Sequence, residues 1–411
     1  MFDKSYLLPS DALQRILKSS PELRPSAERL PIEECYGRVI AHDVIAPEDL
    51  PGFARSTVDG YAVNAADTFG AKETAPAYIT LKGEIFMGMA PAVNIAKGET
   101  AKIPTGGMLP EGADAVVMLE HVQVVSDDMI EVLKSVAPNE NVIQRGEDVK
   151  NGEVIIIKGH RLRAQDIAAL AGLGITEIEV YMKPVVAVIS TGDEIVPARS
   201  PLGPGQVRDI NSFTLAGLIS DHGGIPVKKG IFKDEYTLIR TAIEEALQES
   251  DMVLISGGTS AGTKDMTADI INDIGSPGVL FHGVSLKPGK PMIGGLVNNK
   301  PILGLPGHPA ATAVCFDLFI RPLLERLSGL HPKRSFFKTA RAKMAKSIAS
   351  SAGREDHIRV ALEELDGEWY AVPVLGKSGL ITTLVKADGT VMIPQEKLGL
   401  DAGEEVTVRL F

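Results

Sequence analysis

The sequence is poor in cysteine and tryptophan, and it contains no long apolar run. Its two cysteines, Cys35 and Cys315, lie far apart, and neither belongs to a CxxC pair. A small disulfide-stapled fold is therefore excluded, and we expect two reduced thiols in a cytoplasmic protein, with a single disulfide between them as the alternative. The run Val185–Ile189 is only strand length, and the N-terminus lacks an apolar signal core. We expect neither a membrane span nor a secretion signal.

An excess of positive charge is also lacking. Lys and Arg number 42 against 53 Asp and Glu, which gives a net charge of −11. Such a chain is not expected to bind nucleic acid or an anionic membrane through its overall field. Hydrophobic residues make up 44% and charged residues 23%, which is typical of globular proteins and excludes a disordered chain or a fibre. At about 150 residues per domain, 411 residues predict two to four domains.

The region 184–328 alternates strands with helices. Strands are predicted at Val185–Ser190, 226–232, Met252–Ile255, Val279–Leu286, Met292–Val297 and Pro301–Leu305. Helices are predicted at Asn211–His222, with Asn211 as an N-cap, and at 235–249, Lys264–Ile274 and about Pro309–Leu327. This order predicts a mostly parallel sheet with helices on both faces.

The rest of the chain has a different pattern of apolar and polar residues. Residues 10–19 are predicted to form a capped amphipathic helix, and Val154–Ile157 and Arg163–Ala171 are predicted to form a strand and a helix. Short apolar runs broken by turn residues at 76–135 predict small β-modules. Alternating apolar and polar residues from Arg334 onward predict a small β-domain.

Three loops follow strands of the predicted parallel sheet, where ligands of such sheets bind. Ser256–Gly262 is glycine-rich and precedes a helix, so its backbone could hold a phosphate, or it could be a plain turn. Lys287–Pro291 holds two lysines in a stiff turn, which suits an oxyanion site or a solvated surface turn. Gly304–Pro309 ends in a Pro-started helix, and His308 there is either structural or functional.

Carboxylates accompany these loops. Asp193 and Glu194 follow the first strand, and Asp265 opens the helix after the glycine-rich loop. Carboxylates beside a phosphate loop commonly hold Mg²⁺, although Asp193 could equally cap a turn. The sequence has no GxxxxGK[ST], no GxGxxG and no HxH or HExxH pair, which argues against a P-loop protein, a dinucleotide-binding fold and a zinc enzyme.

In their order along the chain, these loops resemble the MoeA / gephyrin E-domain family, the molybdopterin molybdenumtransferases. The motifs that carry the resemblance are Ser56–Ala62, Lys102–Val117, Arg145–Asp148, Gly192–Glu194, Gly205–Asn211, Ser256–Asp265, Lys287–Pro291 and Gly304–Pro309. The likeness covers essentially the whole chain.

The resemblance implies a multidomain α/β protein. Its central domain would be a MogA-like doubly wound α/β domain with a mostly parallel sheet, accompanied by β-rich domains and an elongated dimerising N-terminal part. The implied parts are 1–45 with 146–180 (N-terminal α/β dimerisation part), 46–145 (inserted β-rich domain), 181–328 (MogA-like molybdopterin-binding domain) and 329–411 (C-terminal β-domain).

The resemblance also implies an activity in molybdenum cofactor biosynthesis. Such enzymes insert molybdenum from molybdate into adenylylated molybdopterin and release AMP, with Mg²⁺ as the metal, although Zn²⁺ has also been invoked. The implied assembly is a cytoplasmic homodimer. A MogA-type adenylyltransferase and recipient molybdoenzymes are possible partners, and neither nucleic acid nor membrane is implied.

The resemblance assigns roles to residues. The implied catalytic residues are Asp59, Thr105, Asp148, Glu194, Asp234, Asp265 and Lys287, with Glu194 and Asp265 as metal ligands. Residues implied to bind the pterin nucleotide or molybdate are Ser256, Gly257, Gly258, Ser260, Gly262, Lys287, Pro288, Lys290, Pro306, Gly307, His308, Arg354 and Ser378. Asp59 and Thr105 would reach the cleft across the dimer interface.

Four positions depart from the family pattern. Val58 replaces a Met, Gly283 stands where some members have a basic residue, and His308 replaces an Asn. Ala311 replaces a Ser that is thought to help hold molybdate in the family, so His308 is expected to compensate with an N–H group. Ala311 keeps open a pterin carrier or scaffold with weak insertion activity. A MogA-like adenylyltransferase acting alone is disfavoured by the β-rich modules.

Overall fold

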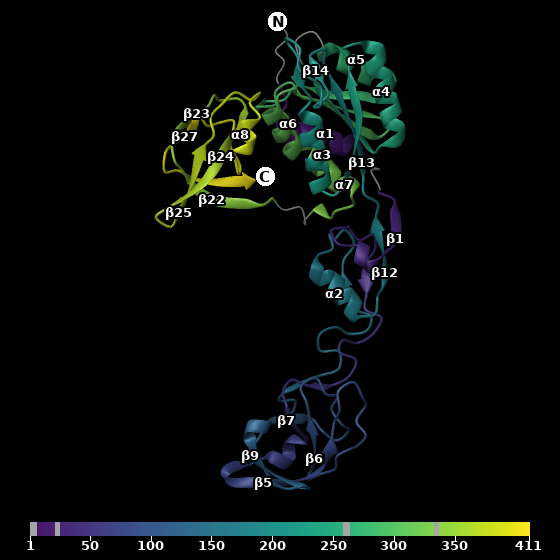
Figure 1. The fold of residues 1–411 in the computed structure, drawn as a ribbon, viewed down its shortest axis with the longest axis vertical. Helices are drawn as coiled ribbons and strands as arrows, with labels where there is room; N and C mark the ends of the chain where they lie inside the picture. Colours follow the sequence, from purple (N-terminus) through teal and green to yellow (C-terminus); the bar gives the residue numbers. More distant parts are fainter. Residues whose placement is uncertain (1–5, 21–24, 258–263, 333–336) are drawn as a thin grey trace.

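The protein is an elongated molecule made of distinct parts (Figure 1). The computed structural model describes residues 6–20, 25–257, 264–332 and 337–411, with Lys264 and Asp265 described by their backbone only. The central and C-terminal domains lie side by side at one end, and a small α/β part joins them to a β-rich domain at the other end.

The central domain is built on one twisted sheet. Its strands lie in the order β16 (Ile225–Phe232), β13 (Val185–Thr191), β17 (Met252–Gly257), β21 (Lys300–Leu305), β20 (Ile293–Val297) and β18 (Pro277–His282). The first four run parallel, and β20 and β18 add antiparallel pairings at one edge. The predicted mostly parallel sheet is confirmed.

Helices cover both faces of this sheet. One face carries α4 (Tyr236–Glu249) and α5 (Lys264–Ile274). The other carries α1 (Pro9–Ser19), α3 (Asn211–Asp221), α6 (Pro309–Cys315), the π-helical stretch η4 (Phe316–Ile320) and α7 (Arg321–Leu327). Because strand side chains alternate, Val186 and Val188 enter one core while Ala187 and Ile189 enter the other. Burial on both faces explains the continuous apolar run of β13.

Three local expectations differ from the structure. The side chain of Asn211 does not cap α3; Asp209 does, by accepting a hydrogen bond from Ser212 N at 3.1 Å. The strand predicted over Val279–Leu286 stops at His282, because Gly283 turns the chain with φ +87°. Helix α1 packs in the central core through Ala12 and Ile16, although residues 1–45 were assigned to the N-terminal part.

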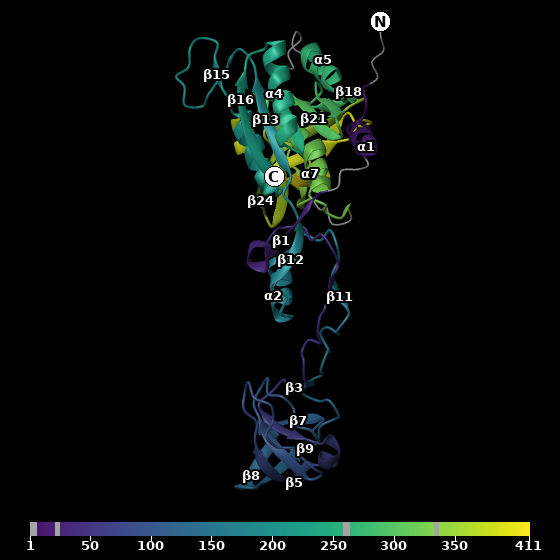
Figure 2. The same ribbon diagram turned by 90° about the vertical axis from the view of Figure 1, so that its right-hand side faces the viewer.

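The N-terminal α/β part is small. Strand β1 (Ala27–Pro31) pairs antiparallel with β12 (Glu177–Tyr181), helix α2 (Ala164–Gly172) packs beside them, and η1 (Ile32–Glu34) follows β1. Strand β2 (Val44–Ile45) pairs with β11 (Val154–Ile156). Two segments of chain, one that follows β2 and one that precedes β11, connect this part to the β-rich domain (Figure 2).

The inserted domain is β-rich, as predicted. It is entered through the pair β3 (Arg55–Ser56) and β10 (Val142–Ile143). Its main sheet has the order β7 (Ala115–Met118), β4 (Gly60–Val63), β6 (Glu99–Ile103), β5 (Lys72–Glu84), β9 (Met129–Lys134) and β8 (Val122–Ser126). Short 3₁₀ turns η2 (Ala65–Thr68) and η3 (Leu119–His121) complete it.

The C-terminal domain is also a β-domain, and it joins the central domain by strand pairing. Strand β19 (Leu286–Lys287) runs parallel to β24 (Glu355–Leu365). The sheet continues through β25 (Glu368–Pro373), β22 (Thr339–Met344), β28 (Glu405–Leu410) and β26 (Gly389–Ile393), with α8 (Thr382–Val385) beside it. The remaining short pairs are β14 (Ile195–Val196) with β15 (Val207–Arg208), and β23 (Ile348–Ala349) with β27 (Gly399–Leu400).

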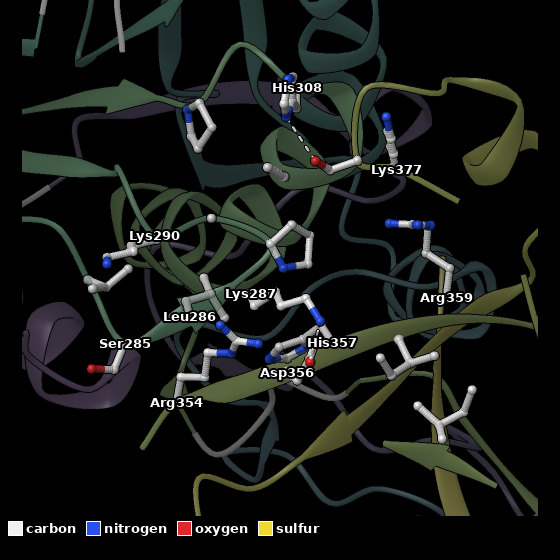
Figure 3. A pocket seen from close by; sticks show the side chains of 18 of the residues that line it. Ser285, Leu286, Lys287, Lys290, His308, Arg354, Asp356, His357, Arg359 and Lys377 are labelled. Carbon is white, nitrogen blue, oxygen red and sulfur yellow. Dashed lines mark hydrogen bonds and ion pairs between the residues drawn. The ribbon is translucent and has the colours of Figure 1, made fainter. Parts of the chain in front are cut away.

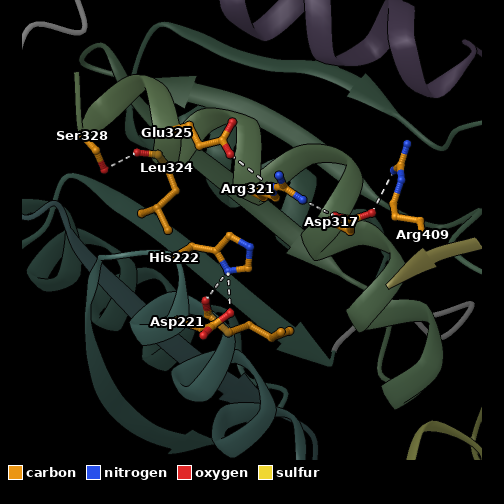
Figure 4. Close-up of polar contacts among 9 residues, drawn as sticks. Asp221, His222, Asp317, Arg321, Leu324, Glu325, Ser328 and Arg409 are labelled. Carbon is orange, nitrogen blue, oxygen red and sulfur yellow. Dashed lines mark hydrogen bonds and ion pairs between the residues drawn. The ribbon is translucent and has the colours of Figure 1, made fainter. Parts of the chain in front are cut away.

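A second contact between these domains is a charged cluster, which we call the Arg409 cluster (Figure 4). Arg409 of β28 donates to Asp317 of η4 at 2.8 Å, and Asp317 also lies 3.4 Å from Arg321. The ring of Phe337 lies under both guanidinium groups, at 4.0 Å from that of Arg321 and 3.8 Å from that of Arg409. The cluster is completed by Glu325, which accepts from Arg321 at 3.1 Å.

Cys35 and Cys315 are both free and buried, in separate hydrophobic cores. In the described parts of the chain, no helix has the length and apolar character that crossing a bilayer requires.

Candidate functional site

Two adjoining cavities lie at the end of the molecule that holds the central and C-terminal domains. The first, about 720 Å³, lies between the Lys287–Pro291 loop and the C-terminal domain, and we call it the cationic cavity (Figure 3). The second, about 580 Å³, lies at the carboxyl ends of β13 and β17, and we call it the strand-end cavity. Pro291, Pro306 and His308 line both. A ligand of two parts could therefore extend from one cavity into the other.

The cationic cavity carries a strong excess of positive charge. Its described lining includes the basic side chains of Lys287, Lys290, Arg354, Arg359 and Lys377. Asp356 is the one acidic residue among the described lining residues. Lys290 lies on one side of the cavity, and Arg359 and Lys377 lie on the opposite side (Figure 3). The wall of this cavity therefore attracts anions although the whole chain is acidic.

Three buried nitrogen atoms in this wall have no hydrogen-bond partner among the described residues. They are Arg354 Nε, His357 Nε2 and Arg359 Nε, all on or next to β24, and His357 Nε2 lies 3.6 Å from Glu355 Oε2, beyond hydrogen-bond distance. Burial lowers the pKa of the Arg359 guanidinium, and the nearby Asp356 carboxylate partly opposes this effect. Because a buried polar group without a partner costs about 1–3 kcal/mol, three of them in one cavity indicate that a ligand with several acceptor oxygens completes the site.

The Lys287–Pro291 loop is fixed by close packing on the core and by an ion pair with β24. Gly289 has φ +132°, and a Cβ there would lie 2.7 Å from Leu286 Cδ2 and 3.0 Å from Cys315 Sγ. Only glycine allows the loop to pack this closely on the core. Lys287 Nζ lies 2.9 Å from the buried carboxylate of Asp356, which ties the loop to β24. Burial raises the pKa of the Cys315 thiol, so this cysteine is a packing residue and not a nucleophile.

The Gly304–Pro309 loop meets the C-terminal domain at His308. Its Nδ1 lies 2.8 Å from Ser378 Oγ, and Ala310 N donates to Ser378 O at 3.2 Å. Ala311 is buried and lines the cationic cavity, so its missing hydroxyl belongs to that wall. Thr312 cannot replace it, because its hydroxyl donates to Pro306 O at 2.6 Å. His308 and Ser378 thus lie near Ala311, the position at which the family pattern has a serine.

The strand-end cavity is organised by Asn211. Its Nδ2 donates to Ser256 Oγ and to Gly307 O, both at 2.8 Å. One side chain therefore holds the end of β17 and the third loop together. The Oδ1 atom of Asn211 is buried and accepts no hydrogen bond from any described residue, which leaves an acceptor at the cavity wall.

Three carboxylates line the strand-end cavity, those of Glu194, Asp209 and Asp234, and Asp209 already accepts hydrogen bonds from Ser190 Oγ and Ser212 N. Burial raises the pKa of Asp234, and repulsion from Asp193 and Glu194 raises it further. The Oδ1 atom of Asp234 is buried and has no hydrogen-bond partner among the residues that the structure describes. No group of three His, Cys, Asp or Glu side chains with metal-binding geometry occurs in the described residues. Mg²⁺ is commonly held by one or two carboxylates with substrate phosphates, so Glu194 and Asp234 fit such a site.

Three of the implied catalytic residues lie far from both cavities along the same chain. Asp59 and Thr105 lie together in the distal β-rich domain, where Asp59 Oδ1 accepts from Thr105 N at 2.8 Å. Asp148 lies in the connecting segment, where its backbone N–H donates to Leu50 O at 3.1 Å. The structure therefore groups Glu194, Asp234 and Lys287 around the cavities, whereas Asp59, Thr105 and Asp148 line neither cavity, and the β-rich domain lies at the other end of the molecule (Figure 1).

The remaining implied binding residues are distributed as follows. Ser256, Gly257, Pro306, Gly307 and His308 line the strand-end cavity, and Lys287, Pro288, Lys290, Pro306, His308, Arg354 and Ser378 line the cationic cavity. Gly258, Ser260, Gly262 and the side chain of Asp265 lie outside the described residues.

Several site residues were missed from the sequence. Asn211 was interpreted only as a helix cap, although it ends one of the motifs quoted above. His357 and Arg359 were not singled out. Both lie on β24, which also carries Glu355, Asp356, Glu363 and Glu364, so the composition of the strand does not set them apart.

Comparisons with known proteins agree over the whole chain. Residues 8–174 match the MoeA N-terminal region (domain I and II), 187–326 match a probable molybdopterin binding domain, and 341–411 match the MoeA C-terminal region (domain IV). A putative molybdopterin biosynthesis protein of Methanocaldococcus jannaschii is 40% identical over 92% of this chain and 91% of its own length.

A molybdopterin molybdenumtransferase of Haemophilus influenzae is 33% identical over 93% of this chain and 94% of its own length. The crystal structure of a molybdopterin biosynthesis MoeA protein from Pyrococcus horikoshii OT3 is 33% identical, with a TM-score of 0.86 over 99% of this chain and all of that one. Both the sequence and the architecture are therefore shared along the full length.

Proposed function

Because this chain belongs to the MoeA family of molybdenum cofactor biosynthesis enzymes, the molybdopterin molybdenumtransferases, we propose that it inserts molybdenum from molybdate into adenylylated molybdopterin and releases AMP. The observation that carries this proposal is the cationic cavity. Its wall contains three buried nitrogen atoms that lack a hydrogen-bond partner in the described part of the chain, and it adjoins a second cavity at the strand ends.

In this proposal the cationic cavity binds molybdate, a tetrahedral dianion. Arg354, Ser378 and the lysines of the Lys287–Pro291 loop come from two domains and surround the same space. Charge-assisted hydrogen bonds from fixed donors are short and strong, so such a wall both binds the oxyanion and orients it. The tie between Lys287 and Asp356 keeps that ammonium in place before the anion arrives.

The strand-end cavity would hold the phosphates of the nucleotide. Ser256 and the backbone of Gly257 and Gly307 line it, and Asn211 fixes their spacing. Glu194 and Asp234, together with Asp265 as the sequence predicts, would hold Mg²⁺, which supplies a Lewis acid that shields the charge of the phosphoanhydride. The carboxylates would keep the metal ion near the bond that is cleaved.

Asp59 and Thr105 then have to act in the site of another subunit. They lie together in the distal domain, far from the cavities of their own chain (Figure 1). An elongated homodimer would bring the distal domain of one subunit to the cavities of its partner. The two free cysteines suit the reducing cytoplasm in which we place this reaction. A MogA-type adenylyltransferase would supply the substrate, and molybdoenzymes would receive the product.

The first experiment measures AMP release from adenylylated molybdopterin with Mg²⁺, with and without molybdate. We expect molybdate to trigger release in the wild type, and Lys287→Ala and Asp265→Ala to reduce it by about 10–100-fold, since each removes a charged contact worth about 1.5–3 kcal/mol. Lys386→Ala, which changes an exposed lysine outside both cavities, is the matched control and should behave as wild type.

A carrier function is the second candidate, and Ala311 is the observation that favours it. The buried methyl group of Ala311 gives the cavity wall no donor, and the Thr312 hydroxyl is committed to Pro306 O. A protein that binds the pterin nucleotide but releases no AMP on addition of molybdate would be a carrier, and the transferase proposal would then be wrong.

A further inference from the structure

An N-terminal aromatic residue lies at the rim of the cationic cavity. Tyr6 precedes the first helix and lines this cavity together with Lys290. The Lys290 ammonium lies 4.6 Å from the centre of the Tyr6 ring. Attraction between a cation and the face of an aromatic ring is significant at this distance. Tyr6 belongs to none of the motifs that the sequence offers.

The backbone around Tyr6 holds the ring in this place. Leu7 forms a parallel bridge with Val284, and Ser285 N donates to Leu7 O at 2.8 Å. Ser285 Oγ donates to Tyr6 O at 3.1 Å. The N-terminal segment is therefore attached to the chain that leads into the Lys287–Pro291 loop, on the side of the cavity where Figure 3 shows Ser285 and Lys290.

Gly283 makes the space that the ring occupies. A Cβ at position 283 would lie 2.4 Å from Tyr6 Cε1 and 2.7 Å from Tyr6 Cδ1. Gly283 also has φ +87°, which disfavours any other residue there. Both the conformation and the missing side chain at position 283 are thus required for Tyr6 to reach Lys290.

The two lysines of the loop are held in different ways. Lys287 is paired with the Asp356 carboxylate at 2.9 Å, which supplies a compensating negative charge. Lys290 has no ion pair within the described residues and contacts the Tyr6 ring instead. An aromatic face attracts a cation but carries no net charge. The positive charge of Lys290 therefore stays available to an anion in the cavity.

We infer that Tyr6 is a positioning residue that holds the Lys290 ammonium at the rim of the cationic cavity for an incoming oxyanion. The inference rests on the proposed function, since molybdate is the anion in question. Tyr6 itself does not touch the reacting atoms. It restricts the rotamers of Lys290 and leaves its charge uncompensated. A carboxylate in the same place would neutralise that charge.

The test measures molybdate binding by equilibrium dialysis and the KM for molybdate in the AMP-release assay. Tyr6→Leu is expected to weaken molybdate binding and raise KM by about two- to fivefold, with kcat little changed, the size of an exposed cation–π contact. Tyr6→Phe keeps the ring face and is expected to match the wild type. Tyr36→Leu, which removes an exposed tyrosine of the distant N-terminal part, is the matched control.

A second measurement does not depend on function. With ¹³Cε-labelled lysine, and Lys290→Arg to assign the signal, the Lys290 resonance should show an upfield ring-current shift in wild type and Tyr6→Phe that is lost in Tyr6→Leu. Gly283→Ala should lose it as well, because its Cβ displaces the ring.

The outcomes separate the two proposals. If the wild type binds molybdate and Tyr6→Leu binds it equally well, the role of Tyr6 is refuted. If the resonance of Lys290 is the same in wild type and Tyr6→Leu, the contact itself is refuted. A wild type that binds no molybdate overturns the proposed function, and the resonance still decides whether Tyr6 holds Lys290.

Discussion

At the scale of single residues, the contact between His308 and Ser378 links the third loop to the C-terminal domain. Its two atoms lie 2.8 Å apart, at the junction of the two cavities. The sequence suggested that His308 compensates for the hydroxyl missing at Ala311. In the structure the His308 ring contacts the hydroxyl of Ser378, so we expect His308 to act through that hydroxyl.

His308→Ala is expected to weaken molybdate binding by about 10–100-fold, because Ser378 loses the partner that orients it toward a charged ligand. His308→Asn should be tolerated, since an amide can take the same hydrogen bond. Ala311→Ser in the His308→Ala background should recover part of the affinity by restoring a hydroxyl in the wall. Molybdate titrations of the four proteins test this, and equal affinity of wild type and His308→Ala would contradict it.

Residue by residue, the sequence revealed the side chains that lie in motifs and missed those that lie on regular strands. Lys287, His308 and Glu194 stand in short loops whose composition is unusual, and each lines a cavity. Arg359 sits within β24, and its function becomes visible only when the fold places its Nε atom in the cavity wall. A single sequence carries no signal for that placement.

At the scale of elements, the start of α2 shows how a buried carboxylate fixes a helix. Asp166 accepts hydrogen bonds from Arg163 N at 2.8 Å and Arg163 Nε at 2.9 Å, and it contacts His160 Nε2 at 2.7 Å. Burial alone would raise the pKa of Asp166, but these hydrogen bonds outweigh it and hold the pKa well below its ordinary value. The ionised carboxylate is therefore part of the fold.

Asp166→Asn is expected to destabilise α2 by about 1–2 kcal/mol, the range for loss of a helix N-terminal cap. Amides of α2 should then exchange about 5–30-fold faster in hydrogen–deuterium exchange. Because the folded-state pKa is depressed, the stabilisation is present above the ordinary Asp pKa of about 4 and is lost as pH falls below it. Asp127→Asn, at an exposed loop position, is the control, and α2 exchange unchanged by Asp166→Asn would argue against this role.

The elements of the central domain were predicted well because local and tertiary signals agree there. Helix α5 spans Lys264–Ile274 as expected, and β13 extends one residue beyond its predicted end. The strand predicted through Gly283 failed for a physical reason. Its apolar residues are shared between β18 and β19, which pair with different sheets, and sequence periodicity does not report the partner of a strand.

At the scale of the whole molecule, the C-terminal domain has to be held against the central domain for the cationic cavity to exist. The Arg409 cluster (Figure 4) is a contact between the two domains in addition to the β19–β24 pairing. No pattern in the sequence indicates this anchor, because Asp317, Phe337 and Arg409 come from three separate segments.

Arg409→Gln is expected to raise the KM for molybdate by about 3–30-fold with a smaller change in kcat, since it removes an ion pair and a cation–π contact together worth about 0.7–2 kcal/mol. With the C-terminal domain held less firmly, Arg354 and Ser378 would spend less time in the wall of the cationic cavity. Steady-state kinetics test this, with Arg29→Gln, an exposed ion pair of the N-terminal part, as control. An unchanged KM would show that the strand pairing alone holds the domain.

The distal position of Asp59 makes a prediction about subunits in trans. Asp59→Ala and Lys287→Ala should each retain at most about a tenth of wild-type activity, but mixed dimers should contain one intact site of two. Random exchange of equal amounts gives about half mixed dimers, and hence about a quarter of wild-type activity. If both residues acted within one chain, mixing would restore nothing, so the activity of co-expressed variants measures which arrangement holds.

The narrow connection to the distal domain has a consequence for how the molecule could be taken apart. Ile45 and Val154 face each other in the β2–β11 pairing, so everything between them leaves and returns at one place. A two-residue hairpin turn could join these strands and delete the distal domain as a cassette. The shortened chain would keep both cavities and their lysines, yet it would have no Asp59 or Thr105 to offer a neighbour. Ligand binding and the catalytic contribution of the distal domain would then reside in separable parts of the chain.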